Sequence, residues 1–538
     1  MVLGTSEENE SMLGNNPAKY TKVDKAKDVI EDIQNNNSNT NLDGLYEVEN
    51  VINRYSSNWK AIFAQCLVAG AVLLLAAGAG MPIGYSAVLL PQLSVKNATM
   101  YVDRELGSWI ASVHSLATPI GSLLSGSFLD ILGRRGSLQL SAIPLCLGWI
   151  VMGLAKNIPT LLCGRIICGV AVGSIAVPSQ VFVGETADPG LRGILVGSSF
   201  AAYSFGILSV YAFGAFLKWN VVAFCSIVLP ILAFFSLMFL PESPIWLIRQ
   251  GKIEKAKDAL LWLRGGDIEQ MNTEITILEA RAKLDAEQKS LATSFGQRVS
   301  LTMSIITSPN VLKPLFIINI FNVLQLSSGT YVIVFYAVDL VRDIGSDNMD
   351  SYSAAIITAL TRFFFSLLAC FLFLKIGRRS LGIFSAIGTS LASFVLVAYT
   401  LIKTEESAMD AYVLGICLFA YVGANTVGLF TLPGLMISEL LPQNARGIAG
   451  GFNFFIFNIL VFIATKFFPA INNAVGITGA FTIFAIFALL EAIFVYVALP
   501  ETMNRTLEQI EDYFQQSNLL WITRSKEKRQ NNELTRLS

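Results

Sequence analysis

Charge and histidine are scarce in this chain of 538 residues. Only 14% of its residues are Asp, Glu, Lys or Arg and 53% are apolar, whereas an average soluble domain has about 25% charged residues. One histidine, His114, is too little for a multi-histidine zinc site, and the seven cysteines show neither metal spacing nor a disulfide framework. We therefore expect a membrane protein without a metal site.

Motifs for nucleotides, nucleic acids and catalysis are missing as well. The chain has no GxxxxGK[ST] sequence, and its net charge of −1 does not favour a nucleic-acid partner. Gly78, Gly80 and Gly84 loosely suggest a dinucleotide loop, but they lie in an apolar stretch, where small residues serve close helix packing. No set of nucleophile, base and acid stands out. We expect no cofactor, no nucleotide and no enzymatic activity.

Twelve apolar stretches are long enough to cross a bilayer. They run over residues 60–83, 107–132, 137–155, 158–179, 193–216, 219–240, 311–341, 352–376, 380–402, 409–435, 447–469 and 475–499. The expected fold class is therefore an all-α membrane protein with twelve transmembrane helices. The predicted segments are a disordered tail (1–58), a six-helix bundle (59–240), a linker with short amphipathic helices (241–310), a second six-helix bundle (311–500) and a second tail (501–538).

One signature occurs in both halves of the chain. Gly133-Arg134-Arg135 follows the second span, and Gly377-Arg378-Arg379 follows the eighth. After each copy come an acid, an arginine seven positions beyond that acid, and a Pro-Glu pair. In the first half these are Glu185, Arg192 and Pro241-Glu242. In the second half they are Glu439, Arg446 and Pro500-Glu501. A half-protein of six spans thus occurs twice, which predicts two pseudo-symmetric bundles that rock against each other.

Lys and Arg placement predicts the orientation. The Gly-Arg-Arg turns, the linker and the basic tail fall on one side of the spans, so we assign that side and both termini to the cytoplasm. In the linker, Ile253, Ala256, Leu260 and Leu263 recur at helical spacing among charges. On the opposite side, the sequon Asn97-Ala98-Thr99 predicts glycosylation of Asn97, which favours the secretory route. We expect the plasma membrane, and the sequence leaves an internal membrane open.

Taken together, these motifs resemble the sugar porter family of the major facilitator superfamily over residues 60–511. The further motifs that carry the resemblance are Gly164-Arg165, Pro241-Glu242-Ser243-Pro244 with Trp246, Gln325 to Gly329 with Phe335-Tyr336, and Thr506-Leu507-Glu508. Gly84-Tyr85-Ser86 with Pro91-Gln92, and Ala464-Thr465-Lys466, resemble insect facilitated trehalose and glucose transporters in particular. The resemblance implies a facilitative carrier for trehalose or a hexose that works by alternating access.

The resemblance also assigns a role to the repeated charges. It implies a cytoplasmic latch that interlocks the two halves when the inner mouth is closed; its members here are Arg134, Arg135, Glu185, Arg192, Glu242, Arg378, Arg379, Glu439, Arg446 and Glu501. Leu374 stands where the second copy should have an acid. Ordinary positive-inside charge is the alternative explanation.

Polar residues within spans indicate the substrate pathway, because such groups must face the protein interior. Helical spacing places Asn322, Gln325 and Gly329 on one face of the seventh span, with Ser328 beside it. Amide and hydroxyl groups suit the hydroxyls of a sugar, so we expect Asn322, Gln325 and Ser328 to bind substrate. The resemblance implies that Gln325 bonds sugar and that Phe335 and Tyr336 gate the outer mouth.

Other positions depart from the pattern of hexose carriers. Phe200 replaces a glutamine, Arg362 an asparagine and Thr426 a glutamate, and these three stay candidate substrate contacts. Gly434 replaces a tryptophan and Tyr331 an asparagine. A larger sugar such as trehalose, or an altered solute, is therefore left open as substrate.

Arg362 is charged and lies near the middle of its span, where a charge needs a partner or water. One hypothesis is a structural ion pair with Glu491 of the last span. The other is that Arg362 lines the pathway and bonds substrate hydroxyls or an anionic group. The sequence leaves both hypotheses open.

The first span indicates how transport is driven. Proton-coupled porters that resemble this chain carry an aspartate where Ser86 stands, and no Asp or Glu lies in this span. We therefore expect downhill transport; a dependence of uptake on a proton gradient would instead point to His114 or Glu491. The alternatives are a carrier of another small organic solute and a non-transporting nutrient sensor on the same fold.

Overall fold

The structure is a computed structural model that describes residues 58–95, 100–290, 307–344, 351–402, 408–442, 445–503, 510 and 513–514. Three sequence predictions fall wholly or largely outside these residues: glycosylation of Asn97, the first tail and most of the second tail.

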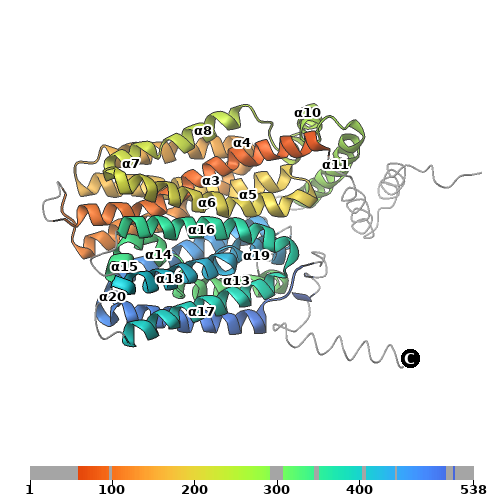
Figure 1. The fold of residues 1–538 in the computed structure, drawn as a ribbon. Coiled ribbons are helices and arrows are strands. Elements are labelled where there is room, and N and C mark those ends of the chain that lie inside the picture. Colours follow the sequence, from red (N-terminus) through yellow and green to blue (C-terminus); the bar gives the residue numbers. More distant parts are fainter. Residues whose placement is uncertain are drawn as a thin grey trace, which may run out of the picture.

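Helices form nearly the whole described chain, in two bundles. The first bundle contains α3 (Trp59–Leu93), α4 (Arg104–Gly153), α5 (Ile158–Thr186), α6 (Pro189–Phe216), α7 (Trp219–Cys225) and α8 (Val228–Met238). The second contains α13 (Pro309–Ser327), α14 (Val332–Phe335), α15 (Ala337–Ile344), α16 (Ser351–Lys375), α17 (Arg378–Ile402), α18 (Ala408–Asn425), the π-helix η2 (Thr426–Phe430), α19 (Leu432–Leu440) and α20 (Arg446–Ala498). The bundles lie side by side as two layers of roughly parallel helices (Figure 1).

Ten helices of the described residues are long and apolar enough to cross a membrane. Two of them, α4 and α20, hold two spans each, because the chain turns at Gly133 (φ 84°) and Gly476 (φ 68°). Within α20, the rings of Phe468 and Phe484, one on each side of Gly476, stack with their centroids 6.3 Å apart. The ten helices therefore supply twelve crossings, and the expected twelve-helix membrane fold is confirmed.

Two spans are less regular than the sequence predicts. The seventh, expected to be continuous over 311–341, breaks after Ser327 into α13, α14 and α15. The tenth, expected to be one regular helix over 409–435, contains the π-helix η2. Both corrections concern the helices that build the centre of the protein.

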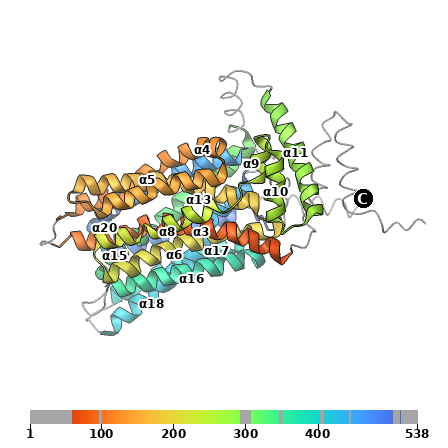
Figure 2. The same cartoon turned by 90° about the horizontal axis from the view of Figure 1, so that it is seen from above.

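The segment between the bundles forms α9 (Pro244–Arg249), α10 (Ile253–Leu263) and α11 (Ile268–Ser290). These helices lie together at one end of the bundles, which we call the linker end, and the opposite end is the distal end (Figure 2). Ala256, Leu260 and Leu263 form the buried face of α10, as their spacing predicts, whereas Ile253, which the same spacing assigns to this face, is exposed at the start of the helix.

A buried ionic network fastens the linker helices to the first bundle. Arg264 donates from Nε and Nη2 to the two carboxylate oxygens of Glu274, both at 2.8 Å, and its Nη1 lies 3.0 Å from Oδ1 of Asp188. Gln65 of α3 donates to Oδ2 of the same aspartate at 2.7 Å. Burial by itself lowers the pKa of Arg264. The hydrogen bond from Arg264 to Glu274 and the negative charges of Glu274 and Asp188 together outweigh this effect, so the pKa of Arg264 is raised. The guanidinium therefore stays charged.

Gly133 is required where α4 turns. Its positive φ disfavours any L side chain, and a Cβ there would lie 2.5 Å from Oε2 of Glu242. That carboxylate accepts hydrogen bonds from the backbone N–H groups of Arg134 at 2.9 Å and Arg135 at 3.0 Å. Glu242 thus caps the N-terminus of the third span, where a negative charge is favourable.

We predict that Gly133→Ala lowers the melting temperature of the detergent-solubilised protein. The change forces a side chain into a left-handed conformation, which costs about 1–2 kcal/mol, and displaces the Glu242 cap. Thermal unfolding followed by size-exclusion chromatography measures the effect. Gly126→Ala on the same helix is the matched control, because nothing lies within 4 Å of its added Cβ. Equal melting temperatures for the two variants would contradict the assignment.

Candidate functional site

The repeated charges form two equivalent networks at the linker end. In the first bundle, Arg134 donates from Nε and Nη2 to the two oxygens of Glu185, both at 2.8 Å. Ser243 donates its hydroxyl to the same glutamate. The pair is largely buried, with 6% of the arginine side chain and 16% of the glutamate side chain exposed. Two parallel bonds to one carboxylate fix both geometry and charge.

The second bundle repeats this arrangement residue by residue. Arg378 donates from Nη2 to Oε1 of Glu439 at 2.8 Å, and Thr502 donates to the other oxygen at 2.5 Å. Glu501 accepts from the backbone N–H groups of Arg378 at 2.9 Å and Arg379 at 3.2 Å, so it caps α17. The two halves of the chain therefore share the same hydrogen-bond pattern at these positions, as their repeated motifs predict.

Each of these networks closes within its own half of the molecule. Arg192 is exposed at the start of α6, and Arg446 begins α20, where its side chain lies outside the described part. An interlock across the halves therefore stays a prediction. In this conformation the charges hold the ends of each bundle in place.

The centre of the protein is built around the break in the seventh span. Gly329 has φ 86°, and a Cβ there would lie 2.7 Å from the ring of Phe484. The helix α13 therefore ends at Ser327. The sequence prediction that Gly329 shares a helical face with Asn322 and Gln325 is wrong, because Gly329 lies beyond the end of this helix. A broken helix leaves backbone carbonyls without helical partners, which is tolerated within a membrane only where other groups bind them.

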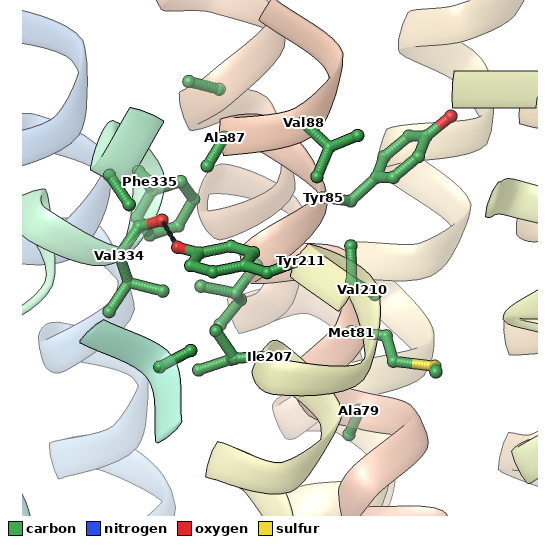
Figure 3. Close-up of a cluster of buried hydrophobic side chains, with 14 of the residues drawn as sticks. Ala79, Met81, Tyr85, Ala87, Val88, Ile207, Val210, Tyr211, Val334 and Phe335 are labelled. Atoms are coloured by element: carbon green, nitrogen blue, oxygen red, sulfur yellow. Dashed lines mark hydrogen bonds between the residues drawn. The ribbon is translucent and has the colours of Figure 1, made fainter. Parts of the chain in front are cut away.

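Three side chains from three other helices bind these carbonyls. Tyr421 of α18 donates to the carbonyl of Ser328, and Arg362 of α16 donates from Nη2 to the carbonyl of Thr330 at 3.2 Å. Tyr211 of α6 donates to the carbonyl of Val334 at 2.5 Å (Figure 3). Because α6 belongs to the first bundle, this last bond joins the two halves of the molecule.

Gln325 connects the break to the π-helix. Its Nε2 donates to the carbonyl of Leu429 in η2 at 2.5 Å. On the other side of η2, Oγ of Ser385 accepts from the N–H groups of Leu429 at 3.0 Å and Gly428 at 3.2 Å. Such π segments are frequent at functional sites. The amide nitrogen of Gln325 is thus occupied, whereas its Oε1 is buried without a partner in the described part of the chain.

Arg362 is buried in this centre, with 2% of its surface exposed. Its guanidinium lies 5.0 Å from the centroid of the Phe430 ring. The ion pair with Glu491 that was one hypothesis from the sequence is absent, since both carboxylate oxygens of Glu491 lack partners among the described residues. A carbonyl and an aromatic face take the place of the acid.

The remaining predicted contacts are all buried in the same region. Asn322 donates from Nδ2 to Oδ1 of Asn453 on α20 at 3.1 Å. Ser328 and Thr426 turn their hydroxyls to backbone carbonyls, of Gln325 at 2.8 Å and of Val422 at 2.6 Å. These two hydroxyl oxygens retain the capacity to accept hydrogen bonds.

Phe200 and Gly434 contact each other across the two bundles. A Cβ at Gly434 would collide with Cζ of Phe200, and the Phe200 ring meets Phe430 edge-on at 6.2 Å. The sequence shows both positions as departures from hexose carriers, a glutamine and a tryptophan being expected there. The Phe200 ring fills the space beside Gly434, so we expect the two departures to compensate each other.

The predicted gate residues lie where the bundles meet near the distal end. Phe335 is fully buried in α14, which packs against α3 of the first bundle (Figure 3), and Tyr336 donates to the carbonyl of Thr465 at 2.9 Å. Further out, Lys466 of α20 donates to Oγ of Ser108 on α4 at 2.7 Å and lies 4.2 Å from the Trp109 ring centroid. The distal end is therefore closed by contacts between the halves. The gating role itself stays a prediction.

Sequence reasoning missed several residues of this centre: Tyr211, Thr330, Tyr421, Asn425 and Asn453. The two asparagines carried a usable signal, because an amide within an apolar span must face the interior. The tyrosines carried none, since their role depends on which carbonyls the break releases. No group of three or more metal-ligating side chains occurs in the described ranges.

We predict that Gly434→Trp lowers the melting temperature, because overpacking against Phe200 costs about 1–3 kcal/mol. The double variant Phe200→Gln/Gly434→Trp is expected to recover much of this loss, since the smaller glutamine vacates the space. Thermal unfolding of the two single variants and the double variant measures the coupling. Strictly additive losses would show that the two positions do not compensate.

Comparison with known proteins agrees with this architecture. The family model described as "Sugar (and other) transporter" matches residues 77–514. A facilitated trehalose transporter Tret1-2 homolog of Drosophila simulans is 29% identical over 459 residues, which is 84% of this chain and 90% of that protein. Trehalose transporter 1 of Drosophila melanogaster is 32% identical over 479 residues, 87% of this chain and 54% of that protein.

Solved structures share the fold. The proton:xylose symporter XylE of the major facilitator superfamily, bound to 6-bromo-6-deoxy-D-glucose, has a TM-score of 0.67 at 22% identity, over 83% of this chain and 99% of its own. A partially occluded inward open conformation of XylE from E. coli has a TM-score of 0.66 at 20% identity, over 82% of this chain and 99% of its own. The fold is thus that of the major facilitator superfamily, and the resemblance seen in the motifs is confirmed. This multi-pass membrane protein belongs to the sugar (and other) transporter family.

Proposed function

We propose that the chain is a facilitative carrier that moves a sugar down its gradient across the plasma membrane by alternating access. The observation that supports this most directly is the polar centre of the second bundle, which the first bundle contacts through Tyr211 and Phe200. There the amide oxygens of Asn322, Gln325 and Asn425 are buried without partners in the described part of the chain. Buried acceptors of this kind suit the hydroxyl groups of a sugar.

Transport without a proton is supported by the surroundings of Arg165 in α5. This arginine is fully buried, and it donates to the carbonyls of Ile110 at 3.0 Å and of Pro82, and to the hydroxyl of Ser86. None of these partners is a carboxylate. A proton-coupled mechanism needs a group near the pathway that gains and loses a proton, and the serine does not titrate.

Trehalose and hexoses are the first candidate substrates. Two relatives that cover most of this chain are described as trehalose transporters. We further propose that the linker end faces the cytoplasm, which follows the positive-inside rule. The two charge networks then lie at the inner mouth, where they act as the latch between conformations.

We predict saturable uptake of labelled trehalose or glucose in oocytes that express the chain. Uptake should be unchanged by external acidification or by a protonophore, because Ser86 offers no proton carrier. Ser86→Asp places a carboxylate against Arg165 and is expected to make uptake depend on pH. Surface biotinylation controls for expression. Stimulation of the unmodified protein by an inward proton gradient would contradict uniport, and binding without flux would favour a sensor.

The latch gives a second prediction. Arg378→Gln leaves the half-buried carboxylate of Glu439 without its bidentate partner and should lower the maximal uptake rate several-fold at normal surface level. Lys375→Gln, an exposed position at the end of α16, is the matched control. Equal uptake by these two variants would show that the second network does not contribute to transport.

A further inference from the structure

Arg362 lies at mid-depth in α16. It is about 16 Å from one end of α16 and about 20 Å from the other, so it sits near the middle of the span. One helical turn further, Ser366 approaches Ser204 of the first bundle, with 3.1 Å between the two hydroxyl oxygens. Residues four positions apart share a helix face. The face of α16 that carries Arg362 is therefore turned toward the other half.

The surroundings of this charge are neutral. Its Nη2 bonds one backbone carbonyl, its plane lies against Phe430, and Tyr211, Tyr331 and Tyr421 lie within its electrostatic range. Its Nη1 has no partner in the described part of the chain. An arginine does not lose its proton in a protein, so a full positive charge stays in the centre. Aromatic faces and one carbonyl compensate such a charge only in part.

The amide groups of the centre are oriented by their own bonds. The amide nitrogens of Asn322, Gln325 and Asn425 all donate within the protein, to Asn453, to the Leu429 carbonyl and to the Thr330 hydroxyl. Their oxygens are therefore the atoms left to accept hydrogen bonds. The centre thus offers three neutral acceptors and one cation, and a complementary solute has several hydroxyl donors and one anionic acceptor.

We propose that the preferred solute is a sugar acid, a polyhydroxylated ring with one carboxylate, whose carboxylate pairs with Arg362. A carboxylate matches the planar fork of a guanidinium and supplies the counter-charge that the described residues do not. This proposal rests on the proposed function as a facilitative carrier and specifies its substrate class. Because the carrier takes no proton, each sugar acid that crosses moves one negative charge, and its uptake depends on the membrane potential.

The test compares labelled glucuronate with labelled glucose in oocytes that express the full chain. We expect a roughly tenfold lower apparent KM for glucuronate, which corresponds to about 1.4 kcal/mol, because a charge-assisted hydrogen bond is stronger than a neutral one. Depolarisation with external potassium should raise glucuronate uptake and leave glucose uptake unchanged. Arg362→Gln should remove the preference, and Arg362→Lys should keep part of it. Thr361→Val, on the neighbouring face of α16, is the matched control.

Thermal stabilisation of the purified protein by each sugar is measured in parallel, so that a variant that folds poorly is recognised. Glucose uptake that equals or exceeds glucuronate uptake in the unmodified protein would overturn the sugar-acid proposal and leave the facilitative carrier standing. Stabilisation by glucuronate without uptake of either sugar would refute the carrier and support the binding preference. Stabilisation by neither sugar, with no uptake, would refute both.

Discussion

The binding of the backbone carbonyls released where the seventh span breaks into α13, α14 and α15 is the constraint on which the rest of the centre depends. Inside a bilayer these carbonyls must find partners, and they find them on three different helices, in Tyr421, Arg362 and Tyr211. The same three bonds position α18, α16 and α6 around the break. The break in the seventh span therefore positions the residues of the polar centre and accounts for one contact between the two halves.

The two bundles are held rigid by a different device. In each, an arginine–glutamate pair and a capping glutamate fix a helix end against its neighbours, and the partners correspond between the halves, as Arg134 with Glu185 and Arg378 with Glu439 show. Bonds of this kind within a bundle leave the surface between bundles free to change. Rigid halves that meet around a polar centre are what a rocking mechanism requires.

The chain keeps the scaffold of its family while altering the centre. Phe200 and Gly434 exchange a large and a small residue across the two halves, so the packing survives although the polar groups change. Arg362 adds a charge, and the aromatic face of Phe430 partly shields it.

The sequence by itself determined the twelve crossings, the internal repeat and the arginine and glutamate residues that pair in each charge network, because hydropathy and repeated motifs are local signals. It also pointed to Asn322, Gln325 and Arg362 as buried polar groups, since a polar side chain in a span must face inward. Only the tertiary structure decided that the seventh span breaks at Gly329, that Phe200 fills the space beside Gly434, and that Arg362 does not pair with Glu491. Each of these features depends on contacts between residues that are far apart in the chain, and a local sequence pattern does not predict such contacts.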